Sequence, residues 1–178
     1  MFAIVLAALD RSGSVLPILC AMAVHELAHI VMMLACGGQV RRLTLRFADL
    51  QIAASGLGYR QELLSALAGP LVNLICGAAF CMQRPSFAAY SLMLGIYTLL
   101  PVWPLDGGRV LRCALLARLP ITQAEHISEI VSFAACAVLL LIGVFLTFFR
   151  KSGLWPLGTA AYLTVRLLML ARRTDAVQ

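Results

Sequence analysis

Charged side chains are scarce in this sequence, and lysine is almost missing. Charged residues make up 12% of the 178 residues against 62% hydrophobic ones, about half the charged fraction of an ordinary soluble domain. Most residues must therefore contact lipid or other apolar helices. The net charge of +6 comes from thirteen arginines and one lysine, which flank the apolar segments and form no single solvated patch. This distribution favours a protein embedded in a lipid bilayer and argues against nucleic-acid binding.

Cysteine pairs of the kind that bind metals or form disulfide frameworks are missing as well. All of the cysteines lie in or beside apolar segments, and none forms a Cys-x-x-Cys pair. This pattern excludes a thiolate zinc site and is typical of small buried hydrophobic residues. Linkers and low-complexity tracts are also absent, which predicts a single membrane-embedded domain over residues 1–178. The six cysteines are Cys20, Cys36, Cys76, Cys81, Cys113 and Cys136.

Long apolar segments dominate what is present. They predict an all-α polytopic membrane protein with about six transmembrane segments, the first of which is short because a full span needs about 20 residues. Pro101 and Pro104 stop the fourth segment, and a short basic helix follows at Arg109–Leu119. The six predicted segments are Met1–Leu9, Val15–Cys36, Leu63–Met82, Phe87–Leu100, Ile127–Phe149 and Leu154–Leu170.

The segment between the second and third apolar stretches has a different pattern. Apolar and polar residues alternate from Leu43 to Ala53, around Ala48 and Asp49. Alternation with a period of two is typical of strands, so the pattern predicts a small β-hairpin or a re-entrant loop. An irregular interfacial loop fits the same residues nearly as well.

The distribution of basic residues also predicts an orientation. With six segments, ten of the fourteen Lys and Arg residues fall on one side of the membrane and four on the other. Because the cytoplasmic side carries the excess of basic residues, both termini are expected in the cytoplasm of a bacterial cytoplasmic membrane. The four residues on the opposite side are Arg11, Arg84, Arg150 and Lys151.

The second apolar segment contains the pentapeptide His25–His29, which has the pattern H-E-x-x-H. On a helix, residues four apart share one face, so both imidazoles can bind one metal ion with Glu26 beside it. Titratable groups at membrane depth are usually functional. The pattern predicts a metal-dependent hydrolase with its site inside the membrane, while a hydrogen-bonded cluster without metal is the alternative.

A catalytic zinc site usually has three protein ligands, so a third ligand is needed. Asp106 is the best candidate, because it is a carboxylate in an apolar setting where prolines and glycines interrupt the helix. Glu125 and Glu129 are rivals, although Thr122 and Glu125 have the pattern of a capping box. His126 is expected to be a solvated interfacial residue.

Three motifs in this order resemble the site-2 protease family of intramembrane metalloproteases, and in particular its sporulation branch. They are His25–His29, Ala68–Asn73 and Leu99–Arg109. The resemblance implies one Zn²⁺ per chain and a membrane-associated protein substrate, with a sigma-factor precursor as the leading candidate. It also implies membrane-protein partners that inhibit the enzyme until a signal arrives.

The proposed chemistry follows from the residue types. His25, His29 and Asp106 would hold the zinc, and Glu26 would act as general base. Asn73 would either bind the substrate or a developing oxyanion, or form a hydrogen bond between packed helices. Thr98 stands where relatives often have asparagine, so it is a second candidate for substrate binding.

Other functional classes fit the sequence less well. The chain has neither the CBS nor the PDZ domain of several relatives, which bears on regulation more than on chemistry. An inactive relative that binds and regulates membrane proteins would have no chemical need for all four of His25, Glu26, His29 and Asp106. A metal or proton transporter would normally place ionisable groups on several helices and show internal repeats, and neither is evident.

Overall fold

The computed structural model describes residues 13–46, 49–55, 58–149 and 155–175. It divides into two compact units, residues 1–99 and 100–178. The division falls at the proline-containing stretch where the sequence predicts an interrupted helix. The predicted first segment, Met1–Leu9, lies outside the described residues, and the single-domain organisation stays a prediction.

The first unit begins with helix α2 (Val15–Ala35), which agrees closely with the second predicted segment. Its end is formed by the two glycines that follow. Gly37 has a φ of 80°, a left-handed conformation that glycine adopts without steric cost. The N–H of Gly37 donates to the carbonyl of Leu34 at 2.9 Å, and that of Gly38 donates to Met33 at 3.0 Å. These two bonds satisfy carbonyls at the helix end and stop the helix there.

Two strands follow, β1 (Gln39–Arg46) and β2 (Asp49–Ser55). They pair antiparallel, with Leu43 opposite Ile52, and the register shifts between residues 40 and 42. The residues that join them, 47–48, lie outside the described part of the chain. The alternating segment thus has an extended, paired backbone in the structure.

Helix α3 (Tyr59–Ala79) begins one turn before the predicted Leu63. The side chain of Gln61 explains the earlier start, because its Oε1 accepts a hydrogen bond from the backbone N–H of Gly58 at 2.9 Å. The same side chain donates to the carbonyl of Cys36 at 3.1 Å. Polar residues form this first turn, which is why a search for apolar segments misses it.

Helix α4 (Pro85–Thr98) is shifted by two residues from the predicted Phe87–Leu100. Proline is favourable at the first helical position, where a backbone N–H would have no helical partner. The N–H of Ala88 donates to the carbonyl of Arg84 at 2.9 Å, which is the first hydrogen bond of this helix.

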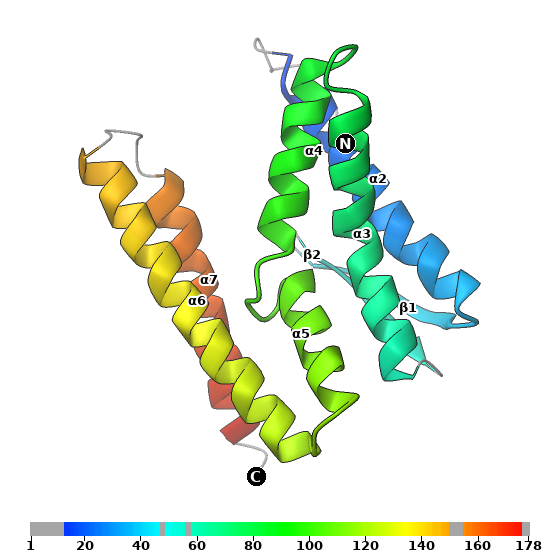
Figure 1. Ribbon diagram of the computed structural model, residues 1–178, viewed down its shortest axis with the longest axis vertical. Coiled ribbons are helices and arrows are strands. Elements are labelled where there is room, and N and C mark those ends of the chain that lie inside the picture. The colour runs from blue at the N-terminus through cyan, green and yellow to red at the C-terminus, as the bar shows by residue number, and fades with distance from the viewer. Residues whose placement is uncertain (1–12, 47–48, 56–57, 150–154, 176–178) are drawn as a thin grey trace. The chain divides into compact units, whose positions relative to one another are not determined.

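Glycines let α3 and α4 approach each other closely. A Cβ on Gly77 would lie 2.4 Å from Cγ of Leu92, and one on Gly95 would lie 3.0 Å from the carbonyl oxygen of Pro70. Small residues at such positions are typical of helices that pack inside membranes. Helix α2 packs against both α3 and α4, so the three helices form one bundle (Figure 1).

The described residues of the second unit form three helices, which pack in chain order. Helix α5 contacts α6, and α6 lies alongside α7 (Figure 1). The last helix extends to Asp175, past the predicted end at Leu170. The bounds are α5 (Asp106–Leu116), α6 (Ile121–Phe149) and α7 (Trp155–Asp175).

The start of α6 corrects one prediction. The helix begins at Ile121, and the N–H of Ala124 donates to the carbonyl of Pro120 at 3.0 Å. Thr122 and Glu125 therefore lie inside the helix, and the predicted capping box is wrong. Pro120 takes the place of the polar cap, because its carbonyl is the first acceptor of the helix.

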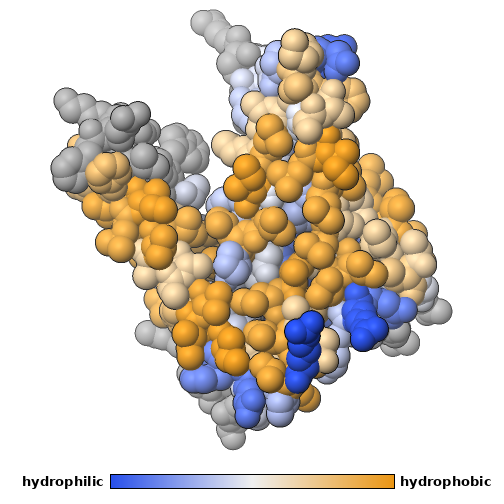
Figure 2. Space-filling model, in the orientation of Figure 1, coloured by the Kyte–Doolittle hydropathy of each residue, from blue (hydrophilic) through white to orange (hydrophobic). Residues whose placement is uncertain are grey.

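The exposed surfaces identify a membrane protein. Three of the described helices are long and apolar enough to cross a bilayer, over Val15–Ala35, Tyr59–Ala79 and Ile121–Phe145. Leu16 and Val31 on α2 are 66% and 62% exposed, and Figure 2 shows apolar side chains over most of the described surface in view. Apolar surface of this extent is unfavourable in contact with water and favourable in contact with lipid. The count of six segments stays a prediction.

Candidate metal centre

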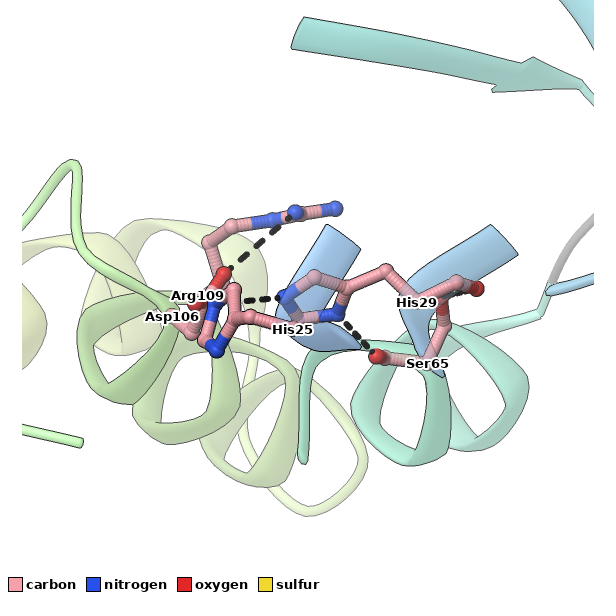
Figure 3. A network of polar contacts seen from close by, with 5 residues as sticks. All are labelled: His25, His29, Ser65, Asp106 and Arg109. Atoms are coloured by element: carbon pink, nitrogen blue, oxygen red, sulfur yellow. Dashed lines mark hydrogen bonds and ion pairs between the residues drawn. The ribbon is translucent and has the colours of Figure 1, made fainter. Parts of the chain in front are cut away.

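His25 and His29 lie on the buried face of α2, as their spacing predicts. Their side chains are only 5% and 7% exposed. The two Nε2 atoms are 3.1 Å apart, and the rings meet edge to face with centroids 4.7 Å apart (Figure 3). Glu26 follows on the next position of α2 and is half-buried. Two imidazole nitrogens thus converge in an apolar bundle.

A backbone carbonyl of helix α3 contacts Nδ1 of His29, the ring nitrogen that does not face His25. Its Nδ1 lies 2.6 Å from the carbonyl oxygen of Ser65 (Figure 3). A carbonyl can only accept, so Nδ1 carries the hydrogen and donates it. The Ser65 hydroxyl in turn donates to the backbone carbonyl of His29 at 3.4 Å. The Nε2 atom of His29 is therefore the ring nitrogen that faces His25.

Nδ1 of His25, the ring nitrogen that does not face His29, contacts Asn73, also on α3. The Asn73 amide nitrogen lies 3.3 Å from Nδ1 of His25, and the Asn73 side chain is fully buried. Of the two predicted roles, this contact is the hydrogen bond between packed helices. A role of Asn73 in substrate or oxyanion binding stays a prediction.

Gly69 provides the space in which the two imidazoles lie. A Cβ at this position would come within 2.3 Å of Nε2 of His29 and 2.9 Å of Cε1 of His25. No side chain other than hydrogen fits here unless the rings move. Sequence reasoning missed this role, although a glycine in the interior of an apolar helix is itself the signal.

Asp106 belongs to the second unit, where it is the first residue of α5. The sequence predicted that this helix resumes at Arg109, and that prediction is wrong by one turn. A carboxylate is favourable at a helix N-terminus, where backbone N–H groups are free. The Asp106 side chain is 15% exposed and lies 3.9 Å from the guanidinium of Arg109 (Figure 3).

The backbone that leads into Asp106 is held by contacts within its own unit. Gly108 packs directly against this backbone, because a Cβ on Gly108 would lie 2.6 Å from the backbone nitrogen of Trp103. The N–H of Trp103 donates to the hydroxyl of Ser132 at 3.1 Å. That hydroxyl donates to the carbonyl of Ser128 at 2.8 Å. Sequence analysis missed Ser132, since a serine in an apolar helix has no distinctive pattern.

Glu125 and Glu129, the other candidates for the third ligand, lie in different environments from Asp106. The carboxylate of Glu125 accepts a hydrogen bond from Arg112 at 2.9 Å, and this guanidinium lies over the Trp103 ring at 6.0 Å. Glu129 and His126 are both exposed, and the interfacial position of His126 stays a prediction.

Thr98, the second predicted substrate residue, makes its hydrogen bond inside its own helix. Its hydroxyl donates to the carbonyl of Leu94 at 2.9 Å. Such back-bonding satisfies a hydroxyl in an apolar helix without any outside partner. A role of Thr98 in substrate binding stays a prediction.

The histidine pair fits a zinc ion. In a tetrahedral site with Zn–N bonds of about 2.0–2.1 Å, two ligand nitrogens lie about 3.3 Å apart. The Nε2 atoms of His25 and His29, at 3.1 Å, match this spacing. Each Nδ1 also has a polar partner on α3, and such contacts orient the imidazole rings.

Comparison with curated proteins finds metalloproteases. No protein-family model matches the sequence. A zinc metalloprotease from Methanocaldococcus jannaschii is 26% identical over 133 residues, which are 67% of this chain and 39% of the relative. Stage IV sporulation protein FB from Bacillus subtilis is 28% identical over 138 residues, 70% of this chain and 47% of the relative. The chain thus spans less than half the length of these two relatives.

Among solved structures, the chain has the fold of a site-2 protease. The site-2 protease from Methanocaldococcus jannaschii matches 94% of this chain and 83% of its own, with a TM-score of 0.68 and 19% identity. The chain is thus similar in fold to a site-2 protease and in sequence to zinc metalloproteases and to a sporulation protein.

Proposed function

We propose that this chain is an intramembrane zinc metalloendopeptidase that cleaves membrane-associated proteins. The observation that carries the proposal is the pair of buried imidazoles whose Nε2 atoms are 3.1 Å apart. Their spacing, their helical partners and the adjacent Glu26 are the donor set and the base that zinc peptidases require. The similarity to zinc metalloproteases supports the same reaction.

Asp106 is the proposed third ligand. Its carboxylate is mostly buried and lies at the start of a helix, where the N-terminal dipole favours the ionised form that binds metal. Glu125 is a weaker candidate because Arg112 already binds its carboxylate, and Glu129 is exposed. One Zn²⁺ per chain would be held by His25, His29 and Asp106.

The chain's own residues provide the remaining chemistry. When bound, zinc polarises the scissile carbonyl and lowers the pKa of a water molecule to about 7. Glu26 is the general base, and it later delivers the proton to the leaving amine. Burial of both imidazoles in the bundle keeps bulk water away and strengthens the electrostatic interactions at the site.

The first test separates metal binding from catalysis. Purified wild type and Glu26→Gln should each contain about one zinc, as expected for a three-ligand catalytic site. The variant should cleave a co-expressed, membrane-tethered sigma-factor precursor roughly 10²–10⁴-fold more slowly, because the general base is lost. Cleavage by Glu26→Gln at the wild-type rate would contradict the assigned base. No cleavage by wild type, with zinc bound, would favour an inactive relative that binds membrane proteins.

The third ligand is tested by zinc content alone. Asp106→Ala should lose the zinc, since two histidines hold it weakly. Glu125→Ala is the matched control and should retain it. Loss of zinc from the Glu125 variant, with zinc retained by the Asp106 variant, would assign the third position to Glu125.

The proposed activity implies further properties. The substrate is a membrane-associated protein, and a sigma-factor precursor is the specific candidate that the sporulation relative supports. Inhibitory membrane-protein partners are part of the same proposal. Co-purification of the Glu26→Gln variant from cells that contain the precursor tests for a trapped substrate.

A further inference from the structure

One side chain bridges the two points where the β-hairpin joins the helices. Oε1 of Gln61 accepts a hydrogen bond from the N–H of Gly58 at 2.9 Å, and its Nε2 donates to the carbonyl of Cys36 at 3.1 Å. Cys36 directly follows α2, and Gly58 directly precedes α3. A backbone N–H can only donate and a carbonyl can only accept, so the two contacts together fix the orientation of the amide.

The role of a helix cap explains only one of these contacts. Gln61 is the third residue of α3, where Glu and Gln both accept a hydrogen bond from the N–H of the residue before the helix. An ionised glutamate has no hydrogen to donate, so it could not bind the Cys36 carbonyl. The end of α2 also has caps of its own, since the N–H groups of Gly37 and Gly38 donate to its carbonyls. The bond to Cys36 therefore joins two helices, across 25 positions of the sequence.

The strands β1 and β2 lie between the two bridged points, and glycines flank them. A Cβ on Gly37 would meet no described atom within 4 Å, and one on Gly58 would meet only Oε1 of Gln61, at 3.9 Å. The backbone can rotate at such uncrowded glycines, because no Cβ restricts φ and ψ. Strand β1 also contacts α2. Gln61 thus restrains the chain at a place where the glycines do not.

We propose that Gln61 is a positioning residue that closes the base of the hairpin, that is, residues 36–38 and 58. Its amide holds the hairpin to α2, the helix that carries His25 and His29. Breaking only the bond to Cys36 should open the base, while the first turn of α3 stays formed. Neither contact of Gln61 involves a proposed metal ligand, so this role is independent of zinc.

Replacing Gln61 by glutamate separates the two contacts. The carboxylate still accepts from the N–H of Gly58, but it has no hydrogen to donate to Cys36. Gln61→Ala removes both contacts. Arg60→Ala is the matched control, because Arg60 precedes Gln61 in the same helical turn and is exposed. Amide hydrogen exchange of the full chain in detergent is measured by NMR for wild type and the three variants.

The N–H groups of Gly37 and Gly38 report on the base of the hairpin, and that of Gly58 reports on the cap of α3. In Gln61→Glu, Gly37 and Gly38 should exchange about 3–10-fold faster than in wild type, the effect of losing one net hydrogen bond on local opening. Gly58 should keep its wild-type rate. In Gln61→Ala all three should exchange faster, and in Arg60→Ala none should change.

Two results would overturn the inference. Wild-type exchange of Gly37 and Gly38 in Gln61→Glu would leave Gln61 as a helix cap alone. Faster exchange throughout α3 and α4 in that variant would show a general loss of structure in place of an opened base. Zinc affinity should be the same in wild type and Gln61→Glu, because His29 contacts α3 one turn further along, at Ser65. If wild type binds no zinc, the proposed function fails while the exchange result stands.

A measurement on wild type alone checks the bridge itself. The two hydrogens on Nε2 of Gln61 give separate NMR signals, and one of them is donated to Cys36. The Gln61 amide hydrogens should exchange with solvent more slowly than those of Gln123, which is exposed. Equal rates for the two glutamines would overturn the inference.

Discussion

Gly69 decides, at the scale of single residues, how close the imidazoles of α2 can come to α3. Gly69 has a hydrogen where other residues have a side chain, and this position faces His29 and His25 directly. A helix interior is an unfavourable place for glycine by about 0.5–1 kcal/mol relative to alanine. The close approach of the two imidazoles is the compensating reason for its presence.

Gly69→Ala should therefore disrupt the site even though alanine favours helices. The added methyl group would lie 2.3 Å from Nε2 of His29, so at least one ring must leave its position. We expect zinc binding to weaken by at least about 10-fold, as when a residue that orients a metal ligand is lost. Chelator competition measures the affinity.

Gly58→Ala is the matched control for this substitution. A Cβ on Gly58 would meet only Oε1 of Gln61, at 3.9 Å, which is ordinary van der Waals contact. Zinc affinity should be unchanged in this variant. Unchanged affinity in Gly69→Ala as well would show that the rings have room to move.

At the scale of elements, the segment between α4 and α5 is held by α6. Ser132 accepts a hydrogen bond from the N–H of Trp103 and donates one to the carbonyl of Ser128. Arg112 of α5 binds Glu125 of α6 in the same region. These contacts fix the chain just before Asp106, so the position of that carboxylate depends on α6.

Ser132→Ala should loosen this segment. The N–H of Trp103, which is partly buried, would lose its acceptor, and this should lower the free energy of unfolding. We expect a lower thermal midpoint in detergent and slower cleavage with Glu26 intact. Ser128→Ala removes a hydroxyl one turn away but keeps the carbonyl to which Ser132 donates, so it should change both quantities much less.

At the scale of the whole molecule, the arrangement of basic residues predicts six membrane segments with both termini in the cytoplasm. A fluorescent protein fused after residue 178 should therefore fold and fluoresce in bacterial cells. Alkaline phosphatase inserted within residues 150–153 should be active, because this connection is predicted on the outer side. The reverse pattern would contradict the predicted orientation.

The predicted and observed helices agree best where neighbouring residues alone determine the helix and its end. The apolar run of α2 and its terminal glycines predict the helix and its end, since both depend on neighbouring residues. The predicted starts of α3, α5 and α6 are wrong by one to two turns. Polar or small residues form the first turns of α3 and α5, and α6 begins at Ile121 directly after Pro120. Hydropathy alone does not detect these starts.

The sequence by itself predicted a membrane protein with a pair of histidines on one helix at the spacing of metal ligands. Composition and a four-residue spacing are enough for both conclusions, because they rest on local periodicity. Only the tertiary structure decided which groups hold the histidines. Ser65 lies 36 positions from His29, and Asn73 lies 48 from His25. Contacts over such separations depend on how the helices pack, which no local pattern contains.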